Sequence, residues 1–210
     1  LTDQTLIEGI NILKPGHFLE IDFLNSKIDS HQYWDYNFTN PSKTIDRDEY
    51  SRELDRLFNQ LKISENSSSA KKIENKIWKL WITHPSEQVL TDLLAEGSSY
   101  MSENQLDNAH KVFTKVIELD PNWAEAWNKR ATVSYLMGNY QLSQNDIDKV
   151  LSLEKRHFGA LSGQGLVQAA LKNYEMAINS YIEAHKIYPT MQSAIIMIER
   201  LQKLIKNKTV

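Results

Sequence analysis

The side chains that could carry catalysis or bind a metal are sparse along this chain of 210 residues. It contains no cysteine, which excludes disulfides, thiolate zinc sites and a cysteine nucleophile within these residues. Asp146 and Asp148 stand two positions apart on a predicted helix, so they point apart, and we interpret them as a solvated face, not an acid–base pair. No two histidines have the spacing of metal ligands, so we predict neither a metal site nor a cofactor. The six histidines are His17, His31, His84, His110, His157 and His185.

Charge and glycine patterns exclude further classes of site. Gly163-Gln164-Gly165 lacks the third glycine of a dinucleotide-binding loop and falls inside a predicted helix, so we interpret it as a close-packing feature. The net charge of −3 comes without a concentrated basic surface, which predicts that the chain does not bind nucleic acid. The apolar run Ala194–Ile198 is far too short to span a bilayer. The basic residues after it are expected to complement the negative end of the last helix. They are Arg200, Lys203, Lys206 and Lys208.

A period of 34 residues between Leu90 and Pro189 organises the chain and must position any site. Small residues recur at Gly97, Ala131 and Gly165. Large ones recur at Leu93, Trp127 and Leu161, and again at Phe113, Ile147 and Tyr181. Small residues let two helices approach, and large ones fill the gap between them, so the period predicts stacked helix–turn–helix units. Pro121 and Pro189 are expected to start the following helices.

This pattern resembles the tetratricopeptide repeat (TPR) family, whose motif runs W-x2-L-G-x2-Y, then A-x3-F, then P. The second unit, residues 124–157, carries Trp127, Gly138 and Tyr140. It departs from the motif at Arg130, Ala131, Ser134, Ser143 and Lys155. The resemblance implies a mainly α-helical solenoid that acts as a scaffold in protein–protein interaction without catalysis.

Three regular units are predicted over residues 90–189. Their first helices are expected at about 89–101, 124–137 and 158–170, and their second helices at about 106–119, 140–153 and 174–187. Residues 47–89 carry two amphipathic stretches, which we interpret as a degenerate leading hairpin stacked on the first regular unit. Residues 190–210 are predicted to form a capping helix and tail. The pairs Trp78–Trp81 and Trp123–Trp127 have helical spacing and are expected in the core.

The resemblance places the candidate partner site on the concave surface, which the first helix of each unit lines. The candidate residues are Leu94, Ser98 and Met101 in the first unit, Glu125, Asn128, Lys129, Thr132, Tyr135 and Leu136 in the second, and Ser162, Leu166 and Ala169 in the third. Some TPR proteins clamp a C-terminal carboxylate with several basic and amide side chains, but here only Asn128 and Lys129 qualify. We therefore expect a mixed apolar and polar groove that takes an extended segment or a helix of a protein partner.

Residues 1–46 differ in pattern from the rest. Two alternating runs, His17–Phe23 and Lys27–Trp34, flank Asn25-Ser26 and predict a β-hairpin followed by a linker. Residues 9–19, G-x3-L-x-P-G-H-x-L, followed by Tyr33-Trp34-Asp35, resemble the end of the glutamine-hydrolysing domain of asparagine synthetases. That family's N-terminal cysteine and its S-G-G-x-D-S loop are missing. We therefore expect that the chain hydrolyses neither glutamine nor ATP, and that residues 1–46 are dispensable for folding of the rest.

Two further functional hypotheses stay open at this point. In the first, the chain is a fragment or fusion of a glutamine-hydrolysing asparagine synthetase whose catalytic residues lie upstream of Leu1. The chain starts with leucine, so a processed terminus or a missing upstream part is expected. In the second, the exposed ends of the array mediate self-association. The absence of cysteine is compatible with the cytoplasmic location that we expect.

Overall fold

The computed structural model describes residues 17–22, 27–32 and 47–208 and divides into two compact units, Leu1–Lys43 and Thr44–Val210. In the N-terminal unit, strand β1 (His17–Asp22) pairs with strand β2 (Lys27–Gln32). The pairing is antiparallel, and its register places His17 opposite Gln32 and Asp22 opposite Lys27. The turn predicted at Asn25-Ser26 and the predicted linker lie outside the described residues.

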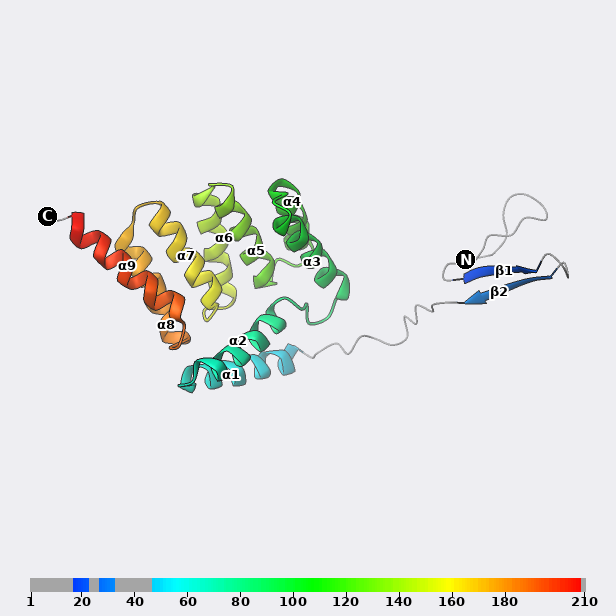
Figure 1. Cartoon of the computed structure of the whole chain (residues 1–210), viewed down its shortest axis with the longest axis horizontal. Helices are drawn as coiled ribbons and strands as arrows, with labels where there is room; N and C mark the ends of the chain where they lie inside the picture. The colour runs from blue at the N-terminus through cyan, green and yellow to red at the C-terminus, as the bar shows by residue number, and fades with distance from the viewer. Residues whose placement is uncertain (1–16, 23–26, 33–46, 209–210) are drawn as a thin grey trace. The chain divides into compact units, whose positions relative to one another are not determined.

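The other compact unit, Thr44–Val210, is the helical unit: its described residues form helices joined by short loops, and the helices lie side by side (Figure 1). The helices are α1 (Arg47–Ile63), α2 (Ser67–Trp81), α3 (Gln88–Ser102), α4 (Leu106–Leu119), α5 (Ala124–Leu136), α6 (Tyr140–Leu153), α7 (Phe158–Ala170), α8 (Tyr174–Ile187) and α9 (Gln192–Lys208). The ends of α3 to α8 lie within two residues of the ranges that the 34-residue period predicts, and α9 lies within the predicted capping segment, residues 190–210. None of the described helices is long and apolar enough to cross a membrane.

The regular units are the pairs α3–α4, α5–α6 and α7–α8. Helix α5 contacts α3 and α7 as well as its own partner α6, so the first helices of the units, α3, α5 and α7, form one layer. The second helices, α4, α6 and α8, pack against this layer, with α4 next to α5 and α6 next to α7. Helix α9 covers the last unit, because its Ala194 and Leu201 are buried against Ala177 and Tyr181 of α8.

In each helix pair, a small residue on the first helix faces a large residue on the second helix, as predicted, and this contact holds the pair together. A Cβ atom added to Gly97 would lie 2.5 Å from the Phe113 ring, and one added to Gly165 would lie 2.5 Å from the Tyr181 ring. These rings therefore occupy the space that a side chain on the first helix would need. Gly163, in contrast, would bring its Cβ only to 3.6 Å from the Ile147 methyl group. The close-packing interpretation of Gly163-Gln164-Gly165 thus holds for Gly165 and not for Gly163.

This difference predicts opposite effects for two substitutions one half-turn apart on α7. Gly165→Ala is expected to lower the free energy of unfolding by about 2 kcal/mol, because the Tyr181 ring must move. Gly163→Ala is expected to leave it unchanged or raise it by up to about 1 kcal/mol, because alanine favours helix over glycine. Urea unfolding of both variants measures the difference, and equal stabilities of the two would contradict this packing.

The leading hairpin, α1 and α2, packs against a part of the array that the sequence did not predict. Its buried Leu57, Leu61 and Trp81 share one core with Phe158 at the start of α7 and Tyr188 after α8. The hairpin is therefore present, but the prediction that it stacks on the first regular unit is wrong. It lies along the edge of the array instead, beneath α5 and α7 in Figure 1. The cause is the aromatic side chains of α2, which fit the third unit.

Two polar contacts extend this attachment across more than a hundred residues of sequence. Arg156 Nη1 donates to Asp55 Oδ1 of α1 at 2.6 Å, and its guanidinium lies 4.4 Å from the centre of the Phe58 ring. The Tyr188 hydroxyl donates to Glu74 Oε2 of α2 at 3.2 Å. The hairpin is thus joined to the third unit through apolar, cation–π and hydrogen-bonding contacts.

Three further expectations need correction. Asp146 is buried, not solvated, because Arg130 donates to both of its carboxylate oxygens at 2.7 and 2.8 Å; Asp148 is exposed as expected. Pro121 and Pro189 start no helix: α5 begins at residue 124 and α9 at residue 192. The carbonyl oxygen of Pro121 instead accepts a hydrogen bond from Trp127 Nε1.

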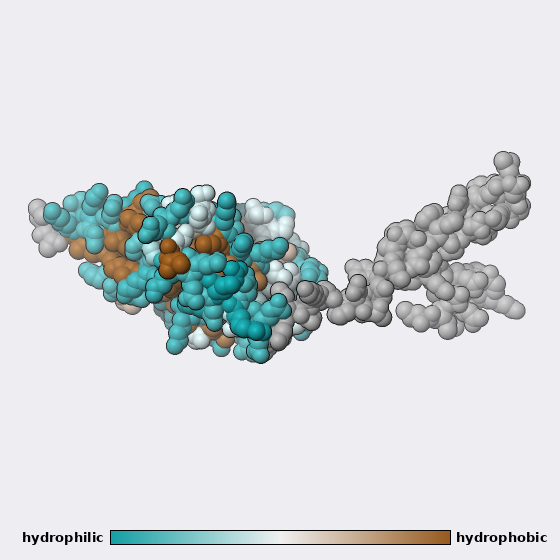
Figure 2. Space-filling view, turned by 90° about the horizontal axis from the view of Figure 1, so that it is seen from below, coloured by the Kyte–Doolittle hydropathy of each residue, from teal (hydrophilic) through white to brown (hydrophobic). Residues whose placement is uncertain are grey.

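The surface of the helical unit is mostly hydrophilic on the side drawn in Figure 2, with smaller apolar areas bordered by polar ones. The large apolar side chains that are exposed come from many helices. They include Ile63, Val89, Leu119, Leu136, Leu142, Leu166, Met176 and Ile196. Scattered exposure of this kind is ordinary for a protein surface, so these residues alone mark no site.

Candidate functional site

The first helices carry the residues predicted to meet a partner, and some of them gather around one hollow. Asn128, Thr132 and Tyr135 of α5 line a hollow of about 60 Å³ together with Gly163 and Leu166 of α7. Thr132 is exposed, and the Leu166 side chain is 40% exposed. The Tyr135 ring is half-buried and lies 5.5 Å from the Tyr140 ring. We call these five residues the groove hollow.

Hydroxyl groups along the first helices donate hydrogen bonds to backbone carbonyl groups of the same helix. Ser98 donates to the carbonyl of Leu94 at 2.8 Å, and Thr132 donates to that of Asn128 at 2.9 Å. Ser162 donates to the carbonyl of Phe158 at 2.9 Å. Each hydroxyl oxygen keeps its lone pairs, so this surface offers acceptors to a ligand.

Other predicted groove residues are part of the core. Leu94 is 2% exposed and packs between α3 and α4, so it cannot contact a partner. Met101 is half-buried and packs against the core that contains Leu94. Ala169 is half-buried and packs against the core that α9 shares with α8. Leu136 is 53% exposed but does not line the hollow. The helical period places all of these on the expected face, but neighbouring elements cover some of them.

Glu125 is the largest departure from the predicted groove, because its side chain is only 1% exposed. Its Oε2 accepts hydrogen bonds from Asn128 Nδ2 at 3.0 Å and from His157 Nε2 at 3.1 Å. The Lys129 ammonium lies 3.4 Å from Oε1, an ion pair without hydrogen-bond geometry. Asn128 and Lys129, the two candidates for binding a carboxylate, are therefore both engaged by Glu125.

His157 links this buried carboxylate to the start of α7. Its Nδ1 accepts a hydrogen bond from the backbone N–H of Ala160 at 3.0 Å, which caps the helix. Since Nδ1 is an acceptor, the ring proton is on Nε2 and is donated to Glu125. One face of the ring stacks on Trp81 of α2, with ring centres 3.8 Å apart and planes 7° apart.

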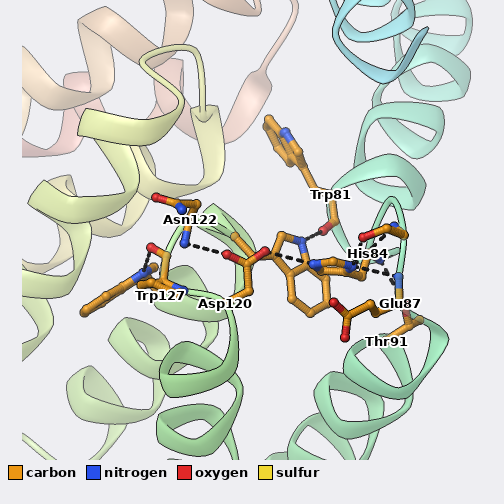
Figure 3. A network of polar contacts seen from close by, with 10 residues as sticks. Trp81, His84, Glu87, Thr91, Asp120, Asn122 and Trp127 are labelled. Atoms are coloured by element: carbon orange, nitrogen blue, oxygen red, sulfur yellow. Dashed lines mark hydrogen bonds and ion pairs between the residues drawn. The ribbon is translucent and has the colours of Figure 1, made fainter. Parts of the chain in front are cut away.

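His84, in the loop before α3, uses its ring in the same way (Figure 3). Its Nδ1 accepts from the backbone N–H of Glu87 at 2.9 Å, and its Nε2 donates to Asp120 Oδ2 at 2.9 Å. The Trp123 ring lies edge-on to the His84 ring at 5.0 Å and donates from Nε1 to the carbonyl of Trp81 at 2.9 Å. Both histidines are therefore structural acceptors at helix starts, which their place in the sequence did not predict.

Helix α2 covers the beginning of α7 and so limits the groove. The Trp78 ring lies where a Cβ on Gly159 would be, at 2.6 Å, and packs edge-on against Phe158 with ring centres 5.6 Å apart. Gly159 also belongs to the lining of the groove hollow. The concave surface is thus covered at the start of α7 and open further along it. A glycine in the first turn of α7 was the one sequence signal for this close approach.

The parts of the chain that the structure describes hold no group of side chains arranged to bind a metal ion. Within residues 17–22, 27–32 and 47–208, no three histidine, aspartate or glutamate side chains cluster as metal ligands. Burial raises the pKa of Tyr181 to about 12, with a smaller contribution from Tyr135, so this phenol near the groove stays neutral.

Comparison with known proteins identifies the family. The family model of the tetratricopeptide repeat matches residues 93–122, which cover the larger part of α3 and all of α4. A TPR repeat-containing protein of Rhizobium etli is 35% identical over 158 residues, which cover 74% of this chain and 76% of that protein. The chain belongs to the tetratricopeptide repeat family. The predicted TPR solenoid is confirmed.

More distantly similar proteins share the fold. RNA polymerase II-associated protein 3 of Rattus norvegicus is 19% identical over 202 residues, and this chain spans only 30% of its length. The structure of the first TPR of Spaghetti (RPAP3), bound to the HSP90 peptide SRMEEVD, matches with a TM-score of 0.55 and 20% identity. It covers 57% of this chain and 94% of that one. The Yersinia enterocolitica chaperone SycD, in complex with a peptide of the translocator YopD, matches with a TM-score of 0.54, 16% identity and coverage of 58% and 97%.

The resemblance of residues 1–38 to asparagine synthetase receives no support from these TPR relatives, and most of the residues that carry it lie outside the described ones. Nothing in the structure favours the amidotransferase hypothesis over the TPR function. It therefore stays a prediction from the sequence.

Proposed function

We propose that this chain is a non-catalytic interaction module that binds a segment of a partner protein across the groove hollow. Support comes from the hollow itself, where apolar Leu166 and Tyr135 lie beside the acceptor oxygens of Thr132 and Asn128. An extended or helical segment offers an apolar side chain for the hollow and N–H donors for these oxygens. The paired β-strands of the N-terminal unit take no part in this proposal.

The same surface disfavours a partner that ends in a free carboxylate. A carboxylate needs unpaired cations or amide donors, and Lys129 and Asn128 both contact Glu125. The RPAP3 and Sti1 domains with similar folds are bound to chaperone peptides, and the RPAP3 one is SRMEEVD. We infer that this chain uses the shared fold for a neutral or apolar segment instead.

Substituting the groove hollow tests this function. Leu166→Ala and Tyr135→Ala are each expected to weaken binding of captured partner proteins by about 2 kcal/mol, roughly 30-fold, because each removes an anchor for a partner side chain. The measurement is quantitative capture from cell extract, followed by affinity measurement with each captured partner. Met176→Ala on α8 is the control, since Met176 is 55% exposed and lies outside the hollow.

Two comparisons complete that experiment. All variants must match the wild type in helicity and melting temperature, so that a folding defect is not read as lost binding. A peptide with the sequence SRMEEVD is expected to bind no more tightly than its C-terminally amidated form. Unchanged partner affinity in both hollow variants, or a strong preference for the free carboxylate, would contradict the proposal.

A further inference from the structure

A second cavity lies away from the groove hollow, between the leading hairpin and the array. It has a volume of about 310 Å³, and its walls come from α1, the end of α2, the α4–α5 loop, the start of α5 and the α6–α7 loop. Three of its lining residues are aromatic: Tyr50, Trp81 and Trp123. The leading hairpin supplies Tyr50, Ser51, Leu54 and Trp81 to this lining, so the regular repeats alone do not form the cavity.

Acidic groups outnumber basic groups around this cavity. Asp120, Glu125 and Glu154 line it. The cation Arg156 is held between Glu154 and Asp55, and Lys129 is held by Glu125. The histidines that contact Asp120 and Glu125 each carry one ring proton, so they add no charge. Four carboxylates and two cations leave a net charge of −2.

Two buried polar atoms of the lining residues have no hydrogen-bond partner. They are Glu125 Oε1 and Trp81 Nε1, on side chains that are 1% and 2% exposed. Buried polar atoms in folded proteins are normally paired, so an unpaired acceptor beside a cavity indicates a place where a ligand donor fits.

The pKa of Tyr50 is also affected by the negative charges around this cavity. Its pKa is raised, first by burial and then by the negative charges of Glu154 and Glu125. The hydroxyl therefore stays protonated, and Tyr50 lines the cavity together with Glu125 and Glu154. Its oxygen adds a further acceptor for a charged donor.

We propose that this cavity binds an organic ammonium group carried on an apolar stem. A primary ammonium supplies three donors and one positive charge, and the aromatic rings that line the cavity favour a cation and its methylene chain. A lysine side chain of a partner protein and a free diamine share this chemistry. The volume is sufficient for a stem of four or five methylene groups.

Titration of the full chain with three probes tests the proposal. The probes are the peptide acetyl-Gly-Lys-Gly-amide, free 1,5-diaminopentane, and the same peptide with its lysine acetylated on Nε. The indole N–H signals of Trp81 and Trp123 report binding by NMR, and calorimetry gives Kd. We expect a Kd on the order of 1 mM for a charged probe, as its few atoms permit, and no shift with the acetylated peptide.

A pair of charge-matched variants locates the effect. Glu154→Gln removes one cavity charge and is expected to raise Kd about tenfold. Glu175→Gln removes one exposed charge from α8 and is expected to leave Kd unchanged. Melting temperatures of both must stay close to wild type; if Glu154→Gln unfolds, the acetylated peptide decides alone.

The outcomes separate the sources of the ammonium group. Binding of the lysine peptide assigns the cavity to a partner side chain, whereas binding of the diamine alone assigns it to a free amine. No indole shift with either charged probe at 50-fold above the expected Kd overturns the proposal, as does equal binding of the acetylated peptide.

Discussion

Replacing Trp81 with alanine is expected to lower the free energy of unfolding of the helical unit by about 4 kcal/mol, the range found for large buried aromatic residues. The side chain is 2% exposed and contacts Phe58, Trp78, His157 and Phe158 with ring centres between 3.8 and 5.9 Å apart. Because Trp81 Nε1 has no partner, the loss is one of packing and stacking and not of a hydrogen bond. In a domain of this size the melting temperature should fall by about 10 °C.

Two companion variants identify the cause. Ile82→Ala changes the next residue, which is 40% exposed, and should alter stability by no more than about 0.5 kcal/mol. Trp81→Phe keeps an aromatic ring and should cost about half as much as alanine. Urea unfolding, followed by circular dichroism, measures all three. A loss below 1 kcal/mol for Trp81→Ala would mean that this ring does not hold the leading hairpin to the third unit.

Replacing Glu125 with alanine is expected to cost about 3 kcal/mol, since it leaves buried donors without their acceptor. The Nε2–H of His157 and the amide of Asn128 both donate to Glu125 Oε2. The Lys129 ammonium also loses the counter-charge of Glu125, which lies 3.4 Å away. Urea unfolding of the variant against the wild type gives the difference in the free energy of unfolding.

The isosteric variant Glu125→Gln separates hydrogen bonding from charge. Its amide oxygen still accepts from His157, so we expect a loss of only about 1 kcal/mol. The ring ¹⁵N signals of His157 should keep the pattern of a proton on Nε2 in the wild type and in Glu125→Gln. A loss as large as that of alanine would show that the charge of Glu125, and not its acceptor oxygen, stabilises the site.

The sequence predicted most of the regular array because repeats depend on local contacts. The column of Gly97, Ala131 and Gly165 faces the column of Phe113, Ile147 and Tyr181 within each unit, and both can be read from one period. Helix ends follow from the same spacing, so α3 to α8 lie where they were expected. Each of these contacts joins residues that are close in sequence.

The position of the leading hairpin could not be predicted from the period. Trp78 and Trp81 have the right spacing for a core, but the spacing does not say which core. Their partners, His157 and Phe158, are about eighty residues further along the chain, at the start of α7. The choice depends on how shapes fit in three dimensions, and periodicity carries no information on that.

The candidate groove was predicted in part for the same reason. Thr132, Tyr135 and Leu166 lie on the face that the helical period assigns and line the groove hollow. Glu125 lies on the same stripe of α5, yet it is buried with His157. Arg130 shows that a local signal was available elsewhere: a cation where the family motif has a leucine indicated a buried counter-charge, which is Asp146.

The contacts of the leading hairpin also bear on how the chain folds. Tyr188 and Glu74 lie 114 residues apart, and Arg156 and Asp55 lie 101 apart, whereas a simple repeat array makes contacts only between neighbours. Such arrays can nucleate anywhere and fray from either end. Here the leading hairpin and the third unit cannot separate without breaking the core that they share. Closing loops of this length slows folding. The shared core also makes the hairpin and the array unfold in a single cooperative transition and not unit by unit.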